Sequence, residues 1–205
     1  MTDLKFQCII IMNQVFKKMI NHIELIQKLL QQPSAELLRC VPNWNIDEIK
    51  NLNYKFAPFK DEMLVSQYAQ SGHDRSKISV YNYHEPNEMP KFITEHVKPR
   101  FDFLDKVCAA FNYFKPGQYL PPHSDLYGKY MQLYDVHPKN IVRCILMLEN
   151  SCPGQILQIK DSTFGSWKSG DCFYWNYDEI HAFYNFSMKD RYAIQITGVI
   201  NEKSK

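Results

Sequence analysis

The stretch of this chain that decides its fold is Gly170-Asp-Cys-Phe-Tyr-Trp-Asn-Tyr-Asp-Glu-Ile-His181-Ala-Phe-Tyr-Asn-Phe-Ser-Met-Lys-Asp-Arg191-Tyr-Ala-Ile-Gln-Ile-Thr-Gly198. Aromatic and β-branched residues alternate with polar ones and are interrupted by turn residues, a pattern typical of β-strands. It predicts strands over 171–176, 180–187 and 191–200. If residues 188–190 form the last turn as a hairpin, Ser187 opposes Arg191 and His181 opposes Thr197.

The two faces of this hairpin differ in character. Side chains two residues apart point to the same face of a strand. One face then carries small and polar groups, which line a cavity better than they fill a core: His181, Phe183, Asn185, Ser187, Arg191, Ala193, Gln195 and Thr197. The other face is apolar and can seat helices, as a half-buried sheet requires.

Further strands are predicted over 107–114, 118–124, 141–149 and 154–160. Upstream, apolar residues recur every three or four positions from about residue 8 to Gln32, which predicts an amphipathic helix ended by Pro33. Two short helices are expected, one after Asn45 and one over 88–97. We therefore expect a single α+β domain over residues 1–205: a double-stranded β-helix (a jelly-roll or cupin-like barrel) over 101–200, with residues 1–100 as mainly helical support.

His123-Ser-Asp125 lies at the end of the predicted strand 118–124 and is a candidate metal site. In an extended chain both side chains point to one face, so they can bind one ion together. With His181 as the third ligand they make a two-His-one-carboxylate triad, which leaves metal positions open for a co-substrate and O2. A similar pattern, His22-Ile-Glu24, lies in the predicted helix, where residues two apart do not face each other.

Arg191 follows His181 by ten residues and shares its predicted face. A planar guanidinium binds a carboxylate through two parallel hydrogen bonds, so Arg191 is the expected anchor for an acidic co-substrate. Other side chains could line the substrate side of this cavity: Tyr127, Tyr130, Arg143, Trp175 and Asn185.

Composition and charge exclude several classes of protein. The 205 residues are 45% hydrophobic, and 24 basic and 22 acidic residues give a net charge of +2 with no basic patch of the kind that binds nucleic acid. The six cysteines form no Cys-x-x-Cys pair, so neither a zinc site nor a disulfide scaffold is indicated.

The apolar run 6–12 is too short for a membrane span, which indicates a cytoplasmic protein. Met12 is an alternative start to Met1.

With its His-x-Asp, distal His and following Arg, the segment 107–199 resembles the iron(II)- and 2-oxoglutarate-dependent oxygenases. The run from Phe111 to His123 looks like the lead-in strand of prolyl-hydroxylase-like members, which places Tyr113 where their co-substrate-binding tyrosine lies. The resemblance implies Fe(II), 2-oxoglutarate and O2, with ascorbate as a candidate accessory reductant. It implies a hydroxylase that converts 2-oxoglutarate to succinate and CO2.

Two residues distinguish this sequence from particular subgroups of the oxygenase superfamily. Thr197 stands where nucleic-acid-repairing members carry a second Arg, and Asp125 is intact where halogenating members have a small residue. Many aspartyl/asparaginyl hydroxylases lack this carboxylate, although their distal segment is similar to that from His181 to Arg191.

The expected substrate is a protein or peptide side chain such as proline, with a free amino acid or small metabolite as the alternative. A non-catalytic cupin-like module that binds a metal or a carboxylate, and a purely structural interaction domain, are the other functions left open.

Overall fold

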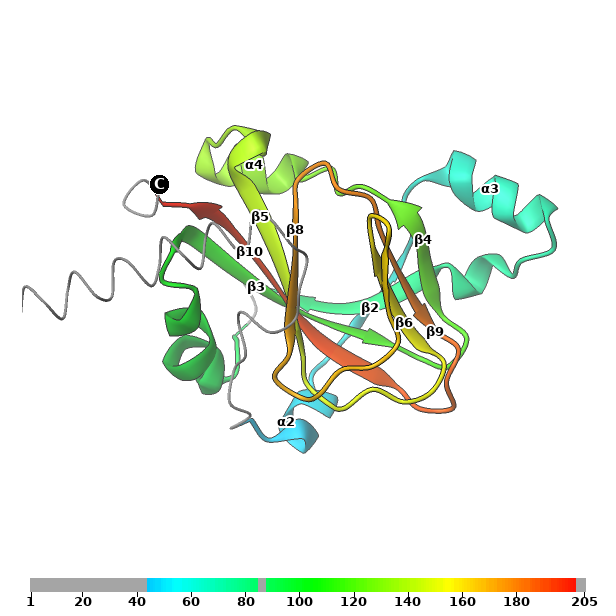
Figure 1. The fold of residues 1–205 in the computed structure, drawn as a ribbon, viewed down its shortest axis with the longest axis horizontal. Helices are drawn as coiled ribbons and strands as arrows, with labels where there is room; N and C mark the ends of the chain where they lie inside the picture. The colour runs from blue at the N-terminus through cyan, green and yellow to red at the C-terminus, as the bar shows by residue number, and fades with distance from the viewer. Residues whose placement is uncertain (1–43, 85–87, 202–205) are drawn as a thin grey trace, which may run out of the picture.

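Two antiparallel sheets face each other in the computed structural model, which describes residues 44–84 and 88–201 (Figure 1). The larger sheet has the strand order β1-β2-β3-β10-β5-β8, and the smaller has the order β4-β9-β6-β7. Strands consecutive in the chain often belong to different sheets, as in a jelly roll. The fold is therefore a double-stranded β-helix, as the sequence predicts.

The larger sheet contains β1 (Lys55–Pro58), β2 (Ser79–His84), β3 (Leu104–Phe114), β5 (Ile141–Met147), β8 (Cys172–Asn176) and β10 (Arg191–Ile200). The smaller sheet contains β4 (Tyr119–His123), β6 (Gln155–Ile159), β7 (Ser162–Phe164) and β9 (His181–Asn185). All seven predicted strands are present, with boundaries that differ by a few residues. Strands β1, β2 and β7 were not predicted, so part of the segment 1–100 belongs to the larger sheet rather than to its helical support.

Short helices connect and cover the sheets: α2 (Ile46–Lys50), α3 (Glu62–Gln70), α4 (Gly128–Tyr134), the π-helical turn η2 (Ile93–Val97), and the 3₁₀ turns η1 (Arg75–Lys77), η3 (Lys98–Phe101) and η4 (Pro138–Asn140). Side chains of Asn45 and Asp61 accept hydrogen bonds from the first turns of α2 and α3, which explains where these helices begin. The two short helices predicted after Asn45 and over 88–97 correspond to α2 and η2. The amphipathic helix predicted over 8–32 lies outside the described residues, as do the pair His22 and Glu24 and the alternative start Met12.

The predicted hairpin between the last two strands is wrong. β9 pairs with β4 and β6 in the smaller sheet, whereas β10 pairs with β3 and β5 in the larger one. The turn at 186–190 therefore carries the chain across from one sheet to the other. The assignment of faces survives, because the period of two along each strand is the same whichever strand lies beside it.

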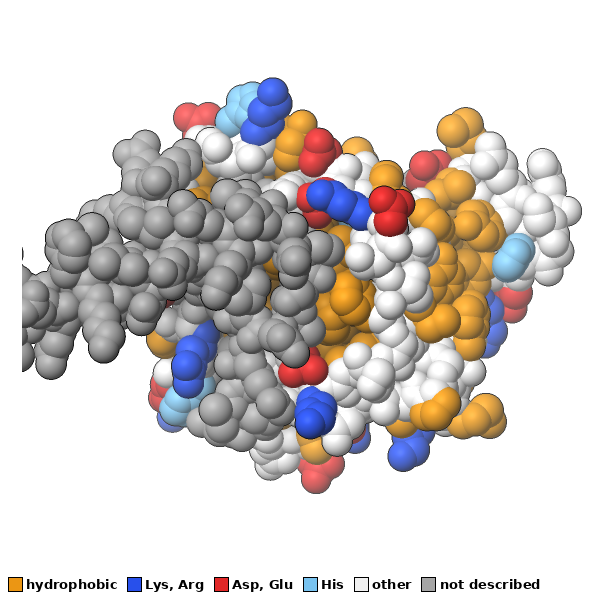
Figure 2. All heavy atoms as spheres, in the orientation of Figure 1, with side chains coloured by type: hydrophobic (Ala, Val, Ile, Leu, Met, Phe, Trp, Pro, Cys, Tyr) orange, Lys and Arg blue, Asp and Glu red, His pale blue; other side chains and the backbone are white. Residues whose placement is uncertain are grey.

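Hydrophobic residues form a layer on each side of the larger sheet. Between the sheets lie Phe114, Ile145, Met147, Leu157, Phe173, Trp175 and Phe183. On the outer side Ile194 and Ile196 pack with Phe92, Ile93 and Phe101 from the helical turns. A third cluster joins Val65 of α3 to Tyr119 of β4, and Figure 2 shows hydrophobic side chains gathered over these two elements.

Two glycines allow close approaches that shape the barrel. A Cβ on Gly198 would lie 2.8 Å from the Leu104 side chain, at the point where the register between β3 and β10 shifts. Gly154 has a φ of +92°, and a Cβ there would lie 2.9 Å from the backbone of Phe186. Gly154 thus holds the β5–β6 connection against the crossing segment that leads to Arg191.

The described cysteines, Cys108, Cys144, Cys152 and Cys172, form no disulfide bond with one another. Among the described residues, no helix has the length and apolar character needed to cross a membrane.

Candidate metal centre

His123 and His181 lie side by side at one end of the smaller sheet. His123 ends β4 and His181 begins β9, and the two are direct partners in the antiparallel register. Their ring centroids are 4.4 Å apart. Phe59 packs against the ring of His123, and Trp175, from the facing sheet, packs against the ring of His181. This aromatic setting fixes both imidazoles between the sheets.

Backbone carbonyls determine the tautomer of each histidine. Nδ1 of His123 lies 2.7 Å from the carbonyl oxygen of Pro121, and Nδ1 of His181 lies 3.1 Å from that of Glu179. A carbonyl oxygen only accepts, so Nδ1 carries the proton in both rings and Nε2 offers a lone pair. Burial lowers the pKa of His123 below its usual value and that of His181 to about 4, so both rings are neutral at pH 7.

Asp125 completes the group two residues after the end of β4. Its Oδ2 atom lies 3.4 Å from Nε2 of His181 and 2.8 Å from Nη1 of Arg143. Burial acts to raise the pKa of Asp125, but the opposite charge of Arg143, the neighbouring histidines and the hydrogen bond from Trp175 together outweigh it and hold the pKa below its usual value. Asp125 is therefore a carboxylate at neutral pH.

The three side chains fit a divalent metal ion. One ligand atom from each of His123, Asp125 and His181 can be chosen so that all lie within 4.8 Å of one another. A neutral Nε2 lone pair turned toward a carboxylate oxygen is an unfavourable contact of two acceptors, and a cation between them resolves it. Two imidazoles and one carboxylate are the ligand set of non-haem iron(II) sites, which leaves other positions of the metal open.

A family model for aspartyl/asparaginyl β-hydroxylase matches residues 69–198, more than half of the chain and all three of these side chains. The chain belongs to this family. The resemblance to the larger oxygenase superfamily is thereby confirmed. The matching model is that of the aspartyl/asparaginyl hydroxylases, whose distal segment the sequence resembles. Asp125 stands at the position that many aspartyl/asparaginyl hydroxylases leave without a carboxylate.

Solved structures similar to this hydroxylase-family chain are remote in sequence. The Schizosaccharomyces pombe Cnp3 cupin domain has 10% identity and a TM-score of 0.37, covering 58% of this chain and 61% of that one. The plu4264 protein from Photorhabdus luminescens has 12% identity and a TM-score of 0.38, covering 61% and 78%. KdgF from Halomonas sp. has 9% identity and a TM-score of 0.36, covering 62% and 84%. A comparison with curated protein sequences found no significant match.

Arg191 is the second functional candidate in this hydroxylase-family site. It begins β10 in the larger sheet, and its guanidinium lies 4.7 Å from the ring centroid of Phe183 and 4.8 Å from that of Trp167. The side chain is 3% exposed, and its Nε atom has no hydrogen-bond partner among the described residues. Nη1 lies 3.4 Å from the carbonyl oxygen of Ile156 and Nη2 lies 3.6 Å from Sδ of Met147, so both contacts are long. Burial lowers the pKa of Arg191 to about 9, which leaves it charged at pH 7.

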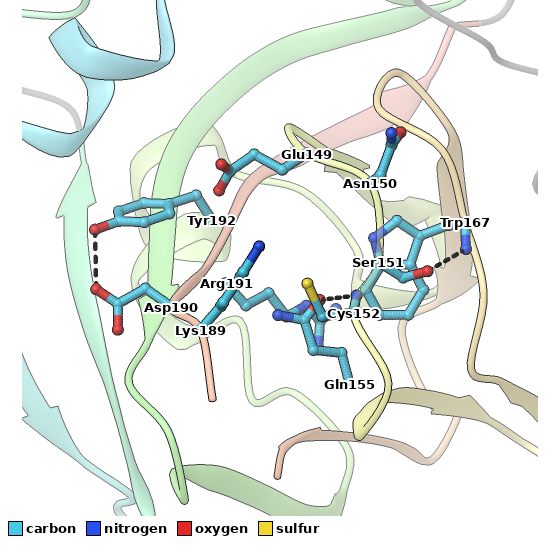
Figure 3. Close-up of a pocket in the computed structure, with 10 residues that line it drawn as sticks. All are labelled: Glu149, Asn150, Ser151, Cys152, Gln155, Trp167, Lys189, Asp190, Arg191 and Tyr192. Atoms are coloured by element: carbon cyan, nitrogen blue, oxygen red, sulfur yellow. Dashed lines mark hydrogen bonds between the residues drawn. The ribbon is translucent and has the colours of Figure 1, made fainter. Parts of the chain in front are cut away.

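A cavity of about 360 Å³ opens beside Arg191 (Figure 3). Its lining comes from the β5–β6 connection, Trp167 and the start of β10: Glu149, Asn150, Ser151, Cys152, Gln155, Trp167, Lys189, Asp190, Arg191 and Tyr192. Gln155 pairs with Asn185, at the opposite end of β9 from His181. The cavity therefore lies at the far end of the barrel from the metal centre, with the Arg191 guanidinium inside the barrel between them.

Three of the predicted substrate-side residues surround Asp125. Arg143 forms an ion pair with Asp125, and Trp175 and the hydroxyl group of Tyr127 donate hydrogen bonds to it. Thr197 was placed correctly on the cavity face, but its partner is Arg143 of β5 and not His181, with which the predicted hairpin had paired it. No sequence signal points to this contact, because it depends on β5 and β10 being neighbours.

The other two predicted residues lie elsewhere, as does Tyr113. Tyr113 stacks between Tyr81 and Tyr192 on the outer side of the larger sheet, whereas its neighbour Phe114 faces Arg191. The structure thus does not bring Tyr113 together with Arg191. Asn185 is fully buried, and its amide donates to the carbonyl oxygens of Phe114 and Lys189. These bonds hold the crossing segment in place. Tyr130 donates to the carbonyl oxygen of Lys106 near the surface.

Proposed function

We propose that this chain is an Fe(II)- and 2-oxoglutarate-dependent hydroxylase, with His123, Asp125 and His181 as the metal ligands and Arg191 as the anchor for the distal carboxylate of 2-oxoglutarate. The observation that carries the proposal is that one barrel holds a three-ligand group and a buried guanidinium whose Nε atom has no hydrogen-bond partner among the described residues. An isolated buried charge costs several kcal/mol, so a guanidinium in this position calls for an anionic partner.

The spacing of the two groups supports 2-oxoglutarate. Phe183, whose ring lies against the Arg191 guanidinium, follows His181 by two residues on the same face of β9. Two residues of a strand span about 7 Å. A five-carbon dicarboxylate that chelates the metal through its keto acid end can reach across a gap of this order.

Each residue has a defined part in this function. The two Nε2 atoms and the Asp125 carboxylate would hold the metal, and Arg191 would orient the co-substrate through paired hydrogen bonds. Trp167, Phe183 and Phe114 surround the guanidinium with apolar surface, which excludes water and strengthens its attraction for a carboxylate. When bound, the metal, 2-oxoglutarate and O2 supply the oxidising chemistry that yields succinate, CO2 and a hydroxylated product.

For the substrate we propose a protein or peptide side chain, with aspartyl and asparaginyl residues as the first candidates. The family description supports this choice. Prolyl peptides, favoured by the lead-in strand 111–123, and free amino acids or other small metabolites are the further candidates to be assayed beside them.

Succinate production tests the proposal. The purified full chain is incubated in air with Fe(II), 2-oxoglutarate and ascorbate, with separate peptide and metabolite libraries, and succinate is followed by NMR. We expect slow succinate formation without substrate, and a gain of one oxygen in the mass of the true substrate. Metal and 2-oxoglutarate binding without any succinate, whatever library is added, would instead favour the non-catalytic cupin-like module.

A further inference from the structure

Asp125 lies among three polar partners that the proposed chemistry does not by itself require. Its Oδ2 atom forms an ion pair with Nη1 of Arg143 at 2.8 Å, and it accepts hydrogen bonds from the hydroxyl of Tyr127 at 3.2 Å and from Nε1 of Trp175 at 3.4 Å. All three partners contact the same oxygen. The carboxylate therefore cannot rotate without breaking them.

Two of these partners, Arg143 and Trp175, come from one row of residues across the larger sheet. Arg143 of β5 is the direct register partner of Trp175 on β8 and of Thr197 on β10. Direct partners in antiparallel strands point to the same face, which here is the inner face. Asp125 follows β4 of the smaller sheet, so this row reaches across the barrel to a metal-ligand candidate carried by the opposite side.

Arg143 is itself fixed from two further directions. Its Nε atom donates to Oγ1 of Thr197 at 3.1 Å, and its guanidinium carbon lies 4.5 Å from the ring centroid of Tyr127. Tyr127 has a φ of +49°, in the left-handed region that non-glycine residues seldom adopt. That backbone conformation directly follows Leu126 and turns the phenol back toward Asp125, so the strained residue contributes both a donor and a stacking surface.

We propose that Arg143, anchored by Thr197 and Tyr127, is a positioning residue that presets the Asp125 carboxylate for the metal, rather than a ligand for the substrate. The inference rests on the proposed metal function. Partners that orient ligating carboxylates commonly change metal affinity 10- to 100-fold when they are removed. The two arginines of the barrel then have separate tasks, Arg143 toward the metal ligand and Arg191 toward the co-substrate.

A test of the positioning role must keep the charge at residue 143 constant. Removing this cation would also remove its repulsion of the bound metal ion, which would raise metal affinity. Arg143→Lys retains the charge but loses the planar group that pairs with Asp125 and donates to Thr197 at once. We expect this variant to raise the dissociation constant for Mn(II) roughly 10- to 100-fold. Arg75→Lys is the matched control, since Arg75 pairs with Glu62 at the surface, and its Mn(II) affinity should equal that of the parent.

Thr197→Val provides a second, nearly isosteric variant in case Arg143→Lys fails to fold. It deletes the anchor and leaves the arginine and its charge in place, so we expect a smaller rise in the Mn(II) dissociation constant, roughly 3- to 10-fold. Mn(II) binding to the full chain is measured by electron paramagnetic resonance of the free ion, with circular dichroism to confirm folding.

The outcomes are distinct. A raised Mn(II) dissociation constant in both site variants and an unchanged one in Arg75→Lys supports the positioning role. Parent-like Mn(II) affinity in Arg143→Lys or in Thr197→Val overturns it, and a simultaneous loss of 2-oxoglutarate or substrate affinity would assign Arg143 to ligand binding. Failure of the parent protein itself to bind Mn(II) would overturn the proposed metal function and this inference with it.

Discussion

Arg143 and Arg191 lie on the same sheet and in the same barrel, yet their surroundings are opposite. Arg143 has a carboxylate at 2.8 Å, a hydroxyl acceptor at 3.1 Å and a tyrosine ring beside it. Arg191 has aromatic rings, two long contacts and an Nε atom without a partner. A buried arginine whose charge is already matched serves the protein's own structure. One whose charge is unmatched indicates where a ligand of opposite charge belongs.

The largest expected effect is the loss of metal binding when one of the three proposed ligands is replaced. Replacing His123, Asp125 or His181 with Ala removes one of three ligands, so stoichiometric Mn(II) or Fe(II) binding at low micromolar concentration should be lost. Titration calorimetry on the parent and the three variants measures this. If Asp125→Ala retained the metal fully, Asp125 would not be a ligand and Arg143 would have no metal-related task.

The next effect separates the two arginines directly. Arg191→Ala should raise the dissociation constant for 2-oxoglutarate roughly 10- to 100-fold, from about 1.5 to 3 kcal/mol per hydrogen bond to a charged group, and should largely spare Mn(II) binding. Arg143→Lys should weaken Mn(II) binding and, once Mn(II) is saturating, leave the affinity for 2-oxoglutarate close to that of the parent. Titration of each ligand into both variants checks the comparison, and equal effects on both ligands in both variants would remove the distinction between the two sites.

Because the charge of Arg191 is unmatched, we expect its replacement by an uncharged side chain to stabilise the ligand-free protein. Arg191→Met keeps an elongated side chain among Trp167 and Phe183 but removes a buried cation that lacks a partner. We expect the ligand-free protein to gain about 1 to 4 kcal/mol in its free energy of unfolding, measured by urea denaturation. A loss of stability would mean that the guanidinium is better compensated than its contacts indicate.

Acid should destabilise the metal-ligand end of the barrel through His181. Burial lowers its pKa to about 4, from the 6.5 of an unperturbed histidine, so the unfolded chain binds the proton more readily than the folded one. Stability without metal should therefore decrease as the pH falls below about 6.5, by about 2 kcal/mol between pH 7 and pH 5. Urea denaturation at both pH values, with His181→Gln as a variant in which this pH dependence is reduced, checks the sign and size. Arg191 stays charged over this range and adds no pH dependence.

The smallest effect is expected at Tyr113. Its ring stacks on Tyr81 and Tyr192, away from the face of Arg191. Tyr113→Phe should leave the dissociation constant for 2-oxoglutarate within about twofold of the parent value. A clear loss of affinity would show that Tyr113 contacts the co-substrate, as the resemblance to prolyl-hydroxylase-like members suggested.

Local patterns predict seven of the ten described strands and the alternation of their side chains. His181 and Arg191 were assigned to one inward face from the period of two together with the hairpin register, and both are buried between the sheets although the hairpin is absent. Which strands lie side by side is a property of the whole barrel, so the sequence pointed to a hairpin where the chain crosses between sheets. The contact of Arg143 with Thr197 depends on that arrangement, as does the row of residues around Asp125. β1 is only four residues long with a mostly exposed pattern, and it was not predicted because it lacks the alternation that marks a half-buried strand.

The central claim is that one barrel holds a metal at His123, Asp125 and His181 and binds 2-oxoglutarate between that metal and Arg191. Its most direct test is an anaerobic titration of the Fe(II)-loaded full chain with 2-oxoglutarate, followed by visible absorption. Chelation of Fe(II) by a keto acid produces a charge-transfer band, and we predict that this band saturates at one equivalent in the parent protein and requires roughly 10- to 100-fold more 2-oxoglutarate in Arg191→Ala. The absence of the band in the Fe(II)-loaded parent, or its appearance with equal affinity in Arg191→Ala, would contradict the account.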